Sequence, residues 1–227
     1  MTPTPRPLSA SLPEPCLAAG AVLAEREGRT IIASYGSVPA EIAVCMKAVG
    51  LIDRSDLGSV EIRAETARLE RALADRLGDP PIAPRWARRL REVWCLRLDR
   101  HRALLVGPHA VLASGSPLAA FPEKDDWSAK DISDEVSILT VIGPRAARLL
   151  SATELPEELA IGAVGRDARD PHVIAILRES QRRILIVAKS EAAEGLWERL
   201  LCAGEPLEAA FVGCDALSLL GAASLRV

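Results

Sequence analysis

Two short segments place carboxylates beside hydroxyls, a combination in which an acid could assist a nucleophile. Asp53 and Ser55 stand in Asp-Arg-Ser-Asp, and Asp131 and Ser133 stand in Asp-Ile-Ser-Asp. No histidine lies near either serine in the sequence to act as a general base. An aspartate two residues before a serine, at the entrance to a strand, is typical of side-chain hydrogen bonds to the backbone. We therefore predict that both segments are structural turns, and the sequence names no catalytic residue.

Patterns for metal and dinucleotide binding are missing as well. The histidines His101, His109 and His172 have no metal-ligand spacing such as H-x-x-x-H, and we predict that they are exposed loop residues. The five cysteines are far apart and form no C-x-x-C pair. No strand is followed by a G-x-G-x-x-G segment. We therefore expect neither a metal nor a dinucleotide on this chain.

The two Asp-x-Ser-Asp segments belong to a longer repeat. Residues 53–60 recur 78 positions later at 131–138, and a charged hairpin at 96–106 recurs 80 positions later at 176–186. Each copy of a repeat is expected to fold as one structural unit. We predict two units, at about 51–120 and 129–203.

Hydrophobic periodicity predicts the elements that position these residues. Ahead of the units we expect a strand at Thr30–Ala33 and an amphipathic helix at Val38–Val49 that Gly50 ends. The first unit is expected to begin with a strand that has one solvent-exposed face (Leu57–Arg63) and a helix (Glu65–Leu77). A short helical turn (Pro84–Leu90), a hairpin (Val93–Leu98 with Ala103–Val106) and a final helix (Ala110–Ala120) are expected to follow. The second unit is expected to begin with a strand (Val136–Ile142) and a helix (Pro144–Ala152). Two strands (Val173–Leu177 and Ile184–Ala188) and a helix (Glu191–Ala203) are expected to follow.

This element order predicts the fold class. Two strand-helix-strand-strand-helix units, with helices packed on antiparallel-rich sheets, make an α+β fold with internal pseudo-symmetry. One intertwined domain over 16–227 is expected rather than two separate ones, because half of this chain would bury its core poorly. The prolines in residues 1–15 predict an extended N-terminal arm.

Composition limits the partners. The 227 residues are 49% hydrophobic and carry a formal charge of −3, with both signs interspersed. Without a basic stripe to neutralise phosphates, nucleic acid is not an expected partner. No apolar run reaches the roughly 20 residues that cross a bilayer, and scattered cysteines suit a reduced compartment. The sequence therefore predicts a cytoplasmic protein without a membrane segment.

Several motifs along the chain resemble motifs of the glycine-cleavage T-proteins, a family of folate-binding aminomethyltransferases, and they occur in the same order. The segment AVGLIDRSDLGSVEI resembles the family signature glfDlSh.g.v.v, and ILTVIGPRAARLL resembles l..l.GP.A...L. Near the C-terminus, LWERLLCAG and VGCDALSLLGAASL resemble two further family motifs. The likeness covers about residues 30–225. It implies the T-protein folate-binding fold, with tetrahydrofolate as the expected ligand.

The departures from the family pattern are also informative. The family carries a GYTGE loop after the arginine of the second hairpin, whereas Arg178 is followed here by Glu-Ser-Gln-Arg-Arg. The paired aspartates of the family fall at Arg91 and Glu92, so the resemblance makes Glu92 the candidate carboxylate for pterin. Arg178 is the second folate-binding candidate. In length and layout the chain is similar to the gamma subunit of heterotetrameric sarcosine oxidase.

The resemblance leaves three functions open. The leading one is a small non-catalytic or folate-binding subunit of a flavin-dependent amine oxidase or demethylase, in one-carbon metabolism. The second is a folate-dependent aminomethyl or methylene transferase, and the third is a stand-alone pseudoenzyme. The arginines of Arg85–Arg91 are interpreted as a helical surface, with a contact to folate polyglutamate or to an acidic partner as the alternative.

Overall fold

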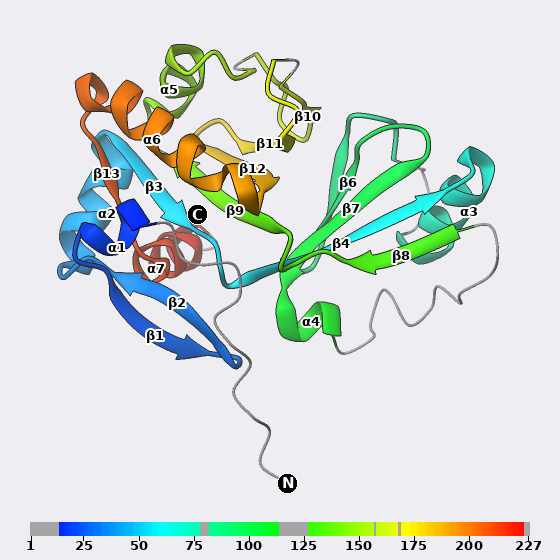
Figure 1. The fold of residues 1–227 in the computed structure, drawn as a ribbon, viewed down its shortest axis with the longest axis horizontal. Helices are drawn as coiled ribbons and strands as arrows, with labels where there is room; N and C mark the ends of the chain where they lie inside the picture. The colour runs from blue at the N-terminus through cyan, green and yellow to red at the C-terminus, as the bar shows by residue number, and fades with distance from the viewer. Residues whose placement is uncertain (1–13, 78–81, 114–126, 157, 168, 225–227) are drawn as a thin grey trace, which may run out of the picture.

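The computed structural model describes residues 14–77, 82–113, 127–156, 158–167 and 169–224, and it shows an α+β fold built on two large sheets (Figure 1). The six-stranded sheet has the order β10 (Val164–Gly165), β11 (Val173–Ser180), β12 (Arg183–Lys189), β9 (Val136–Ile142), β3 (Val49–Asp53) and β13 (Ala209–Phe211). The five-stranded sheet has the order β5 (Ala87–Leu90), β6 (Val93–Arg97), β7 (Arg102–Pro108), β4 (Leu57–Ala64) and β8 (Trp127–Asp131). A separate hairpin joins β1 (Val22–Arg26) to β2 (Arg29–Ser34).

The chain passes between the two large sheets at two crossovers. It leaves β3 of the six-stranded sheet for β4 of the five-stranded sheet, and it returns from β8 to β9. The first crossover contains Asp53–Asp56 and the second contains Asp131–Asp134. Both predicted turn segments therefore lie where the two sheets meet.

Helices cover the outer faces of both sheets. One face of the six-stranded sheet packs against α5 (Ala146–Ala152) and α6 (Ala193–Gly204), with Leu149 and Trp197 in that core. The outer face of the five-stranded sheet packs against Leu69 and Leu73 of α3 (Thr66–Leu77). The short helices of the described chain are α1 (Glu14–Ala18), α4 (His109–Ala113), η1 (Ser190–Ala192) and η2 (Glu205–Leu207).

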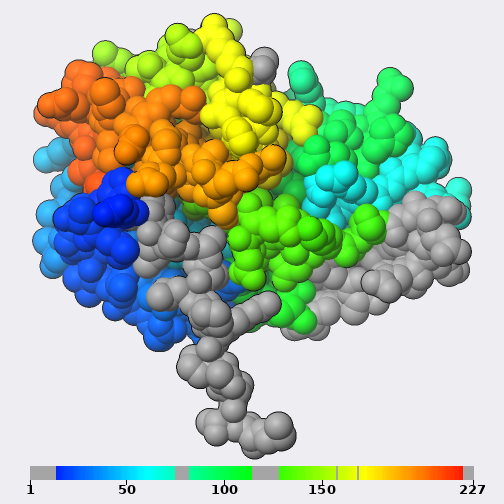
Figure 2. Space-filling model, in the orientation of Figure 1, coloured from blue at the N-terminus to red at the C-terminus, as the bar shows by residue number. Residues whose placement is uncertain are grey.

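The inner face of the six-stranded sheet has two neighbours. Its β12 residues Leu185 and Val187 pack against Leu104 of the five-stranded sheet. Further along, Ile52 of β3 packs against α2 (Val38–Lys47) and α7 (Cys214–Ser224). In the space-filling view the yellow and orange surface of β11, β12 and α6 adjoins the green surface of the β6–β8 region (Figure 2). Beside the inner face, residues at the start of α7 and residues of the five-stranded sheet line the two sides of one seam.

The predicted helix after Ser37 is present but ends earlier than expected. The Ser37 hydroxyl accepts a hydrogen bond from the amide of Ala40, 3.4 Å away, and a proline in the first turn suits the unpaired amides there. The helix ends at Lys47, so the prediction that Gly50 ends it was wrong. Gly50 lies inside β3, where a Cβ atom would be 2.7 Å from the sulfur of Cys45. Close packing of α2 on β3 explains this glycine.

Two other local predictions were wrong. Pro84–Leu90 was expected to be a helical turn, but Ala87–Leu90 is β5, because pairing with β6 overrides the helix propensity of its arginines. The strand at Leu57–Arg63 was expected to have one solvent-exposed face, but all residues of Gly58–Ile62 are buried. This strand lies between β7 and β8, and ion pairs from Arg63 and Arg102 cover the Glu61 carboxylate.

The other predicted elements occur in the predicted order, with boundaries shifted by a few residues, whereas β1, β3, β8, β10, β13 and α7 were not predicted. Residues 1–13 of the predicted arm lie outside the described residues, and Glu14 and Pro15 begin α1. Of the helix predicted at Ala110–Ala120, residues 114–120 also lie outside them. The strand orders of the two sheets correspond, since β5-β6-β7-β4-β8 parallels β10-β11-β12-β9-β3. Duplication of the sequence itself stays a prediction.

Candidate functional site

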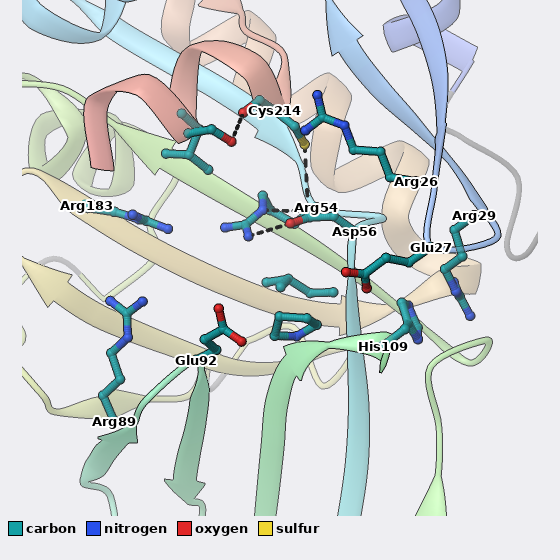
Figure 3. A pocket seen from close by; sticks show the side chains of 14 residues that line it. Arg26, Glu27, Arg29, Arg54, Asp56, Arg89, Glu92, His109, Arg183 and Cys214 are labelled. Atoms are coloured by element: carbon teal, nitrogen blue, oxygen red, sulfur yellow. Dashed lines mark hydrogen bonds and ion pairs between the residues drawn. The ribbon is translucent and has the colours of Figure 1, made fainter. Parts of the chain in front are cut away.

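A cleft of about 480 Å³ opens along the seam beside the first crossover (Figure 3). Five separate parts of the chain form it: the β1–β2 turn, the first crossover, the β5–β6 turn, the end of β7 and the start of α7. Arg183 of β12 completes the wall. The lining contains five arginines against three carboxylates: Arg26, Arg29, Arg54, Arg89 and Arg183, with Glu27, Asp56 and Glu92.

Arg54 forms the floor of the cleft and is almost fully buried. Its Nε and one terminal nitrogen donate to the two carboxylate oxygens of Asp56, at 2.7 and 2.8 Å. The other terminal nitrogen donates to the Thr140 hydroxyl at 3.3 Å. Burial opposes the charge, but the hydrogen bond to Asp56 and the negative charge around it together outweigh burial and raise the pKa of Arg54. A bidentate pair of this kind fixes both side chains.

Cys214 lies above this pair. Its sulfur is 3.7 Å from an Asp56 carboxylate oxygen and 3.5 Å from the carbonyl oxygen of Asp53. Burial, followed by the charge of Asp56, raises the pKa of the Cys214 thiol well above its usual value. The sulfur therefore stays a protonated thiol at neutral pH, and it is not the low-pKa thiolate that nucleophilic catalysis uses.

Both ends of the cleft are rich in arginine. At one end Arg26 pairs with Asp215, and Arg29 pairs with Asp134 at 3.1 Å. At the other end Arg183 pairs with Glu179, and burial lowers the pKa of this arginine. These carboxylates compensate most of the arginine charge, so the cleft is polar without being strongly cationic.

Glu92 and Arg89 stand on the wall opposite the floor. Figure 3 shows the Glu92 carboxylate directed into the cleft and the Arg89 side chain directed toward Arg183. The guanidinium of Arg89 lies 5.7 Å from the centroid of the Trp94 ring and donates to the Arg91 carbonyl at 3.1 Å. Within the described parts of the chain, Glu92 forms no ion pair. This exposed carboxylate is therefore available to a ligand.

His109 was predicted to be an exposed loop residue, and that prediction was wrong. It begins α4 and is half-buried beside Arg29 in the cleft. Burial, and then the charge of Arg29, lower the pKa of His109, so the imidazole is neutral at pH 7. A Cβ on Gly58 would lie 2.6 Å from its Nδ1, which explains the glycine there. Sequence spacing carried no signal for this residue, because its neighbours come from other elements.

Arg178, the second folate-binding candidate, lies on β11 and is not among the described residues that line the cleft. Its terminal nitrogens donate to the backbone carbonyls of Leu159, at 3.0 Å, and Gln181, at 3.5 Å. The structure therefore does not bring Glu92 and Arg178 together. In its present contacts Arg178 joins the β11–β12 turn to the preceding loop.

The structural interpretation of the Asp-x-Ser segments is confirmed. An Asp53 carboxylate oxygen accepts from the amide of Ser55 at 3.2 Å, and an Asp131 oxygen accepts from the amide of Ser133 at 2.9 Å. Among the described residues, no cluster of three or more possible metal ligands occurs. All five cysteines lie in the described chain and are free.

The arrangement of the two large sheets and their helices is that of the T-protein folate-binding fold. The structure of the glycine cleavage system aminomethyltransferase T from Bartonella henselae matches 90% of this chain with a TM-score of 0.73 and 22% identity. This chain spans 60% of that protein's length. Identity at this level shows the fold and leaves the activity open.

A second solved structure is similar over nearly its full length. A chain of heterotetrameric sarcosine oxidase from Corynebacterium sp. U-96, in complex with pyrrole 2-carboxylate, matches with a TM-score of 0.60 and 21% identity. The match covers 76% of this chain and 93% of that one. No protein-family model matches this chain, and no curated protein sequence does.

Proposed function

We propose that this chain is a small, non-catalytic, folate-binding subunit that acts beside a flavin-dependent amine oxidase or demethylase in one-carbon metabolism. The observation that carries the proposal is the cleft, in which the unpaired carboxylate of Glu92 faces an arginine-rich wall. The fold shared with a sarcosine oxidase chain supports the assignment to such a complex.

The chemistry of a reduced folate suits this lining. Its pterin ring presents several N–H donors on one edge, which a carboxylate such as Glu92 accepts in pairs. Its glutamate tail carries carboxylates, for which Arg89, on the same wall as Glu92, is a suitable partner. The volume of about 480 Å³ lies within the usual range for small-ligand sites.

The side chains around the cleft support a binding role better than a catalytic one. The Cys214 thiol, which burial holds protonated, is not a thiolate nucleophile. Arg178 is engaged by backbone carbonyls at the turn where the T-protein family has its GYTGE loop. These residues supply no activated nucleophile.

Isothermal titration with tetrahydrofolate tests the ligand. We expect the wild type to bind and Glu92→Gln to bind at least about ten-fold more weakly, because a charge-assisted hydrogen bond contributes roughly 1.5–3 kcal/mol. Glu198→Gln, on the exposed surface of α6, is the matched control and should bind like the wild type. Arg178→Gln tests the second candidate in the same assay. No binding by the wild type would remove folate from the proposal.

Purification of the tagged chain from the cytoplasm of its native cells tests the assembly. We expect a stoichiometric complex with a second chain that carries flavin absorbance. If the chain elutes alone from a cell lysate prepared at low salt, the proposed subunit function is wrong, and a stand-alone pseudoenzyme becomes the proposed function.

The extensive match to an aminomethyltransferase favours one second candidate, a folate-dependent transferase. The pure chain should then release ammonia from an aminomethylated carrier when tetrahydrofolate is present. Our proposal predicts release no faster than the uncatalysed background. Turnover above that background, abolished by Glu92→Gln, would replace the subunit function with the transferase.

A further inference from the structure

One edge of the five-stranded sheet displays an aromatic side chain among arginines. Strand β5 is the edge strand, and Arg85, Trp86, Arg88 and Arg91 lie on it or at its two ends. Trp86 is 44% exposed and Ile161, on the loop before β10, is 54% exposed. A backbone bridge between Trp86 and Ala163 brings the loop of Ile161 beside β5. We call Arg85, Trp86, Arg88, Arg91 and Ile161 the β5 surface.

The backbone under this surface is fixed from both sides. On the β6 side, the Arg85 amide donates to the Arg97 carbonyl at 2.7 Å, and the Arg97 amide donates to the Trp86 carbonyl at 2.9 Å. On the loop side, the Ala87 amide donates to the Gly162 carbonyl and the Val164 amide to the Arg85 carbonyl, both at 2.8 Å. Trp86 is therefore presented on a rigid platform, and a partner would lose little conformational entropy in packing against it.

Arg85 and Arg91, at the two ends of β5, carry charge that no carboxylate of the described chain compensates. Arginines elsewhere, such as Arg102 and Arg145, form ion pairs with carboxylates. Arg85 and Arg91 have no carboxylate partner among the described residues. Both also have left-handed backbone angles, with φ of 65° and 52°, a conformation that non-glycine residues disfavour. Arg85 and Arg91 thus place one positive charge at each end of β5.

We infer that the β5 surface is an interface for an acidic segment of a partner protein subunit, with Trp86 as the buried anchor and the arginines as its charged rim. Tryptophan and arginine are the residues that contribute most often to binding energy at interfaces. The charge of the cluster selects an acidic partner over a basic one. The inference rests on the proposed function only in taking the partner to be a subunit of the same complex.

Site-specific photo-crosslinking in the native cell tests this interface. A benzoylphenylalanine placed at Ile161 should crosslink to a second protein, and mass spectrometry should locate the crosslink in a segment rich in aspartate and glutamate. The same probe at Leu219, an exposed apolar residue of α7, is the control and should not give that product. The flavin content of the crosslinked partner is measured separately, so an acidic partner without flavin would keep this inference and refute the proposed assembly.

Substitutions then identify the contributing side chains. Trp86→Ala should reduce the crosslink yield by at least about ten-fold, as loss of an interface anchor does. Arg85→Glu combined with Arg91→Glu should reduce it by at least about five-fold, because the reversed charge repels an acidic segment. Arg148→Glu, an exposed arginine of α5, is the matched charge reversal and should leave the yield unchanged. Circular dichroism of each variant checks that it folds.

Several outcomes would overturn the inference. A crosslink to a second copy of this chain, or to RNA, would assign the surface to a different occupant. No crosslink from Ile161 in the intact cell would mean that the surface is uncovered. An equal loss of yield with Arg148→Glu would show a general charge effect in place of a specific interface.

Discussion

The two crossovers share one backbone design and have opposite electrostatic environments. In the first, the Arg54 amide donates to the Ile138 carbonyl and the Leu57 amide to the Arg54 carbonyl, both at 2.9 Å. In the second, the Ile132 amide donates to the Ser59 carbonyl and the Glu135 amide to the Ile132 carbonyl, again at 2.9 Å. The same turn is therefore built twice from the same Asp-x-Ser-Asp pattern.

The two crossovers differ in how their surroundings shift the pKa of the first aspartate. Burial raises the pKa of Asp53 to about 6, although hydrogen bonds from Ser55 partly offset it. Asp131 is exposed, and hydrogen bonds from Ser133 outweigh its partial burial and lower its pKa. The residue after the aspartate is a buried charged Arg54 in one copy and a buried apolar Ile132 in the other. The first crossover forms the floor of a cleft, whereas the second is a structural turn.

The largest difference in stability between the two crossovers is expected at the residue after the first aspartate, which is Arg54 in one and Ile132 in the other. Arg54→Met leaves Asp56 partly buried without its cation, and it should lower the free energy of unfolding by about 3 kcal/mol. Ile132→Met keeps an apolar side chain of similar size and should cost less than about 1.5 kcal/mol. Urea denaturation of both variants measures the difference. Equal losses would mean that the Arg54–Asp56 pair has no special weight.

The pKa shifts of Asp53 and Asp131, the first aspartates of the two segments, have opposite signs, so we expect opposite dependences of stability on pH. Because the folded pKa of Asp53 is raised above its unfolded value near 4, the folded state binds the proton more tightly. Its contribution to stability is therefore complete below about pH 4 and is lost as the pH rises through about 6. Asp53→Asn should be about 1–3 kcal/mol more stable than wild type at pH 7.5 and equal to it near pH 4. Thermal melts across this range measure it, and a constant difference would refute the raised pKa.

The smallest effect is expected at Asp131. Its folded pKa lies below the unfolded value, so its contribution is present above about pH 4 and is lost as the pH falls further. Asp131→Asn should destabilise the protein by less than about 1 kcal/mol at pH 7.5, because the carboxylate is exposed. Melts at pH 7.5 and pH 3 provide the measurement. A stabilising effect at pH 7.5 would place Asp131 in the same class as Asp53.

The sequence predicted the local features of this fold better than its cleft. The Asp-x-Ser turns and both hairpins follow from short-range patterns, and the structure contains them. The arginine-rich β5 was missed because its strand conformation depends on pairing with β6 and with the loop near Gly162. The family resemblance made Glu92 a folate-binding candidate, and that role stays a prediction, whereas its place in the lining of the cleft depends on the β5–β6 turn that holds it.

The cleft itself required the tertiary structure. Arg54 looks like an ordinary charged turn residue in the sequence, and it becomes buried because Cys214 and Thr140 approach from distant parts of the chain. His109 joins the site for the same reason, since Arg29 comes from the β1–β2 hairpin. Contacts between residues so far apart in sequence leave no periodic signal.

The exchange of strands at the crossovers has a consequence for assembly. Strand β3 completes the sheet of β9–β12, and β8 completes the sheet of β4–β7, so each half of the chain supplies one strand to the other half's sheet. A polypeptide with only one of these halves would have to trade its first strand with a second copy to fill both sheets. The strand order within the single chain therefore resembles that of a dimer whose protomers exchange one strand each.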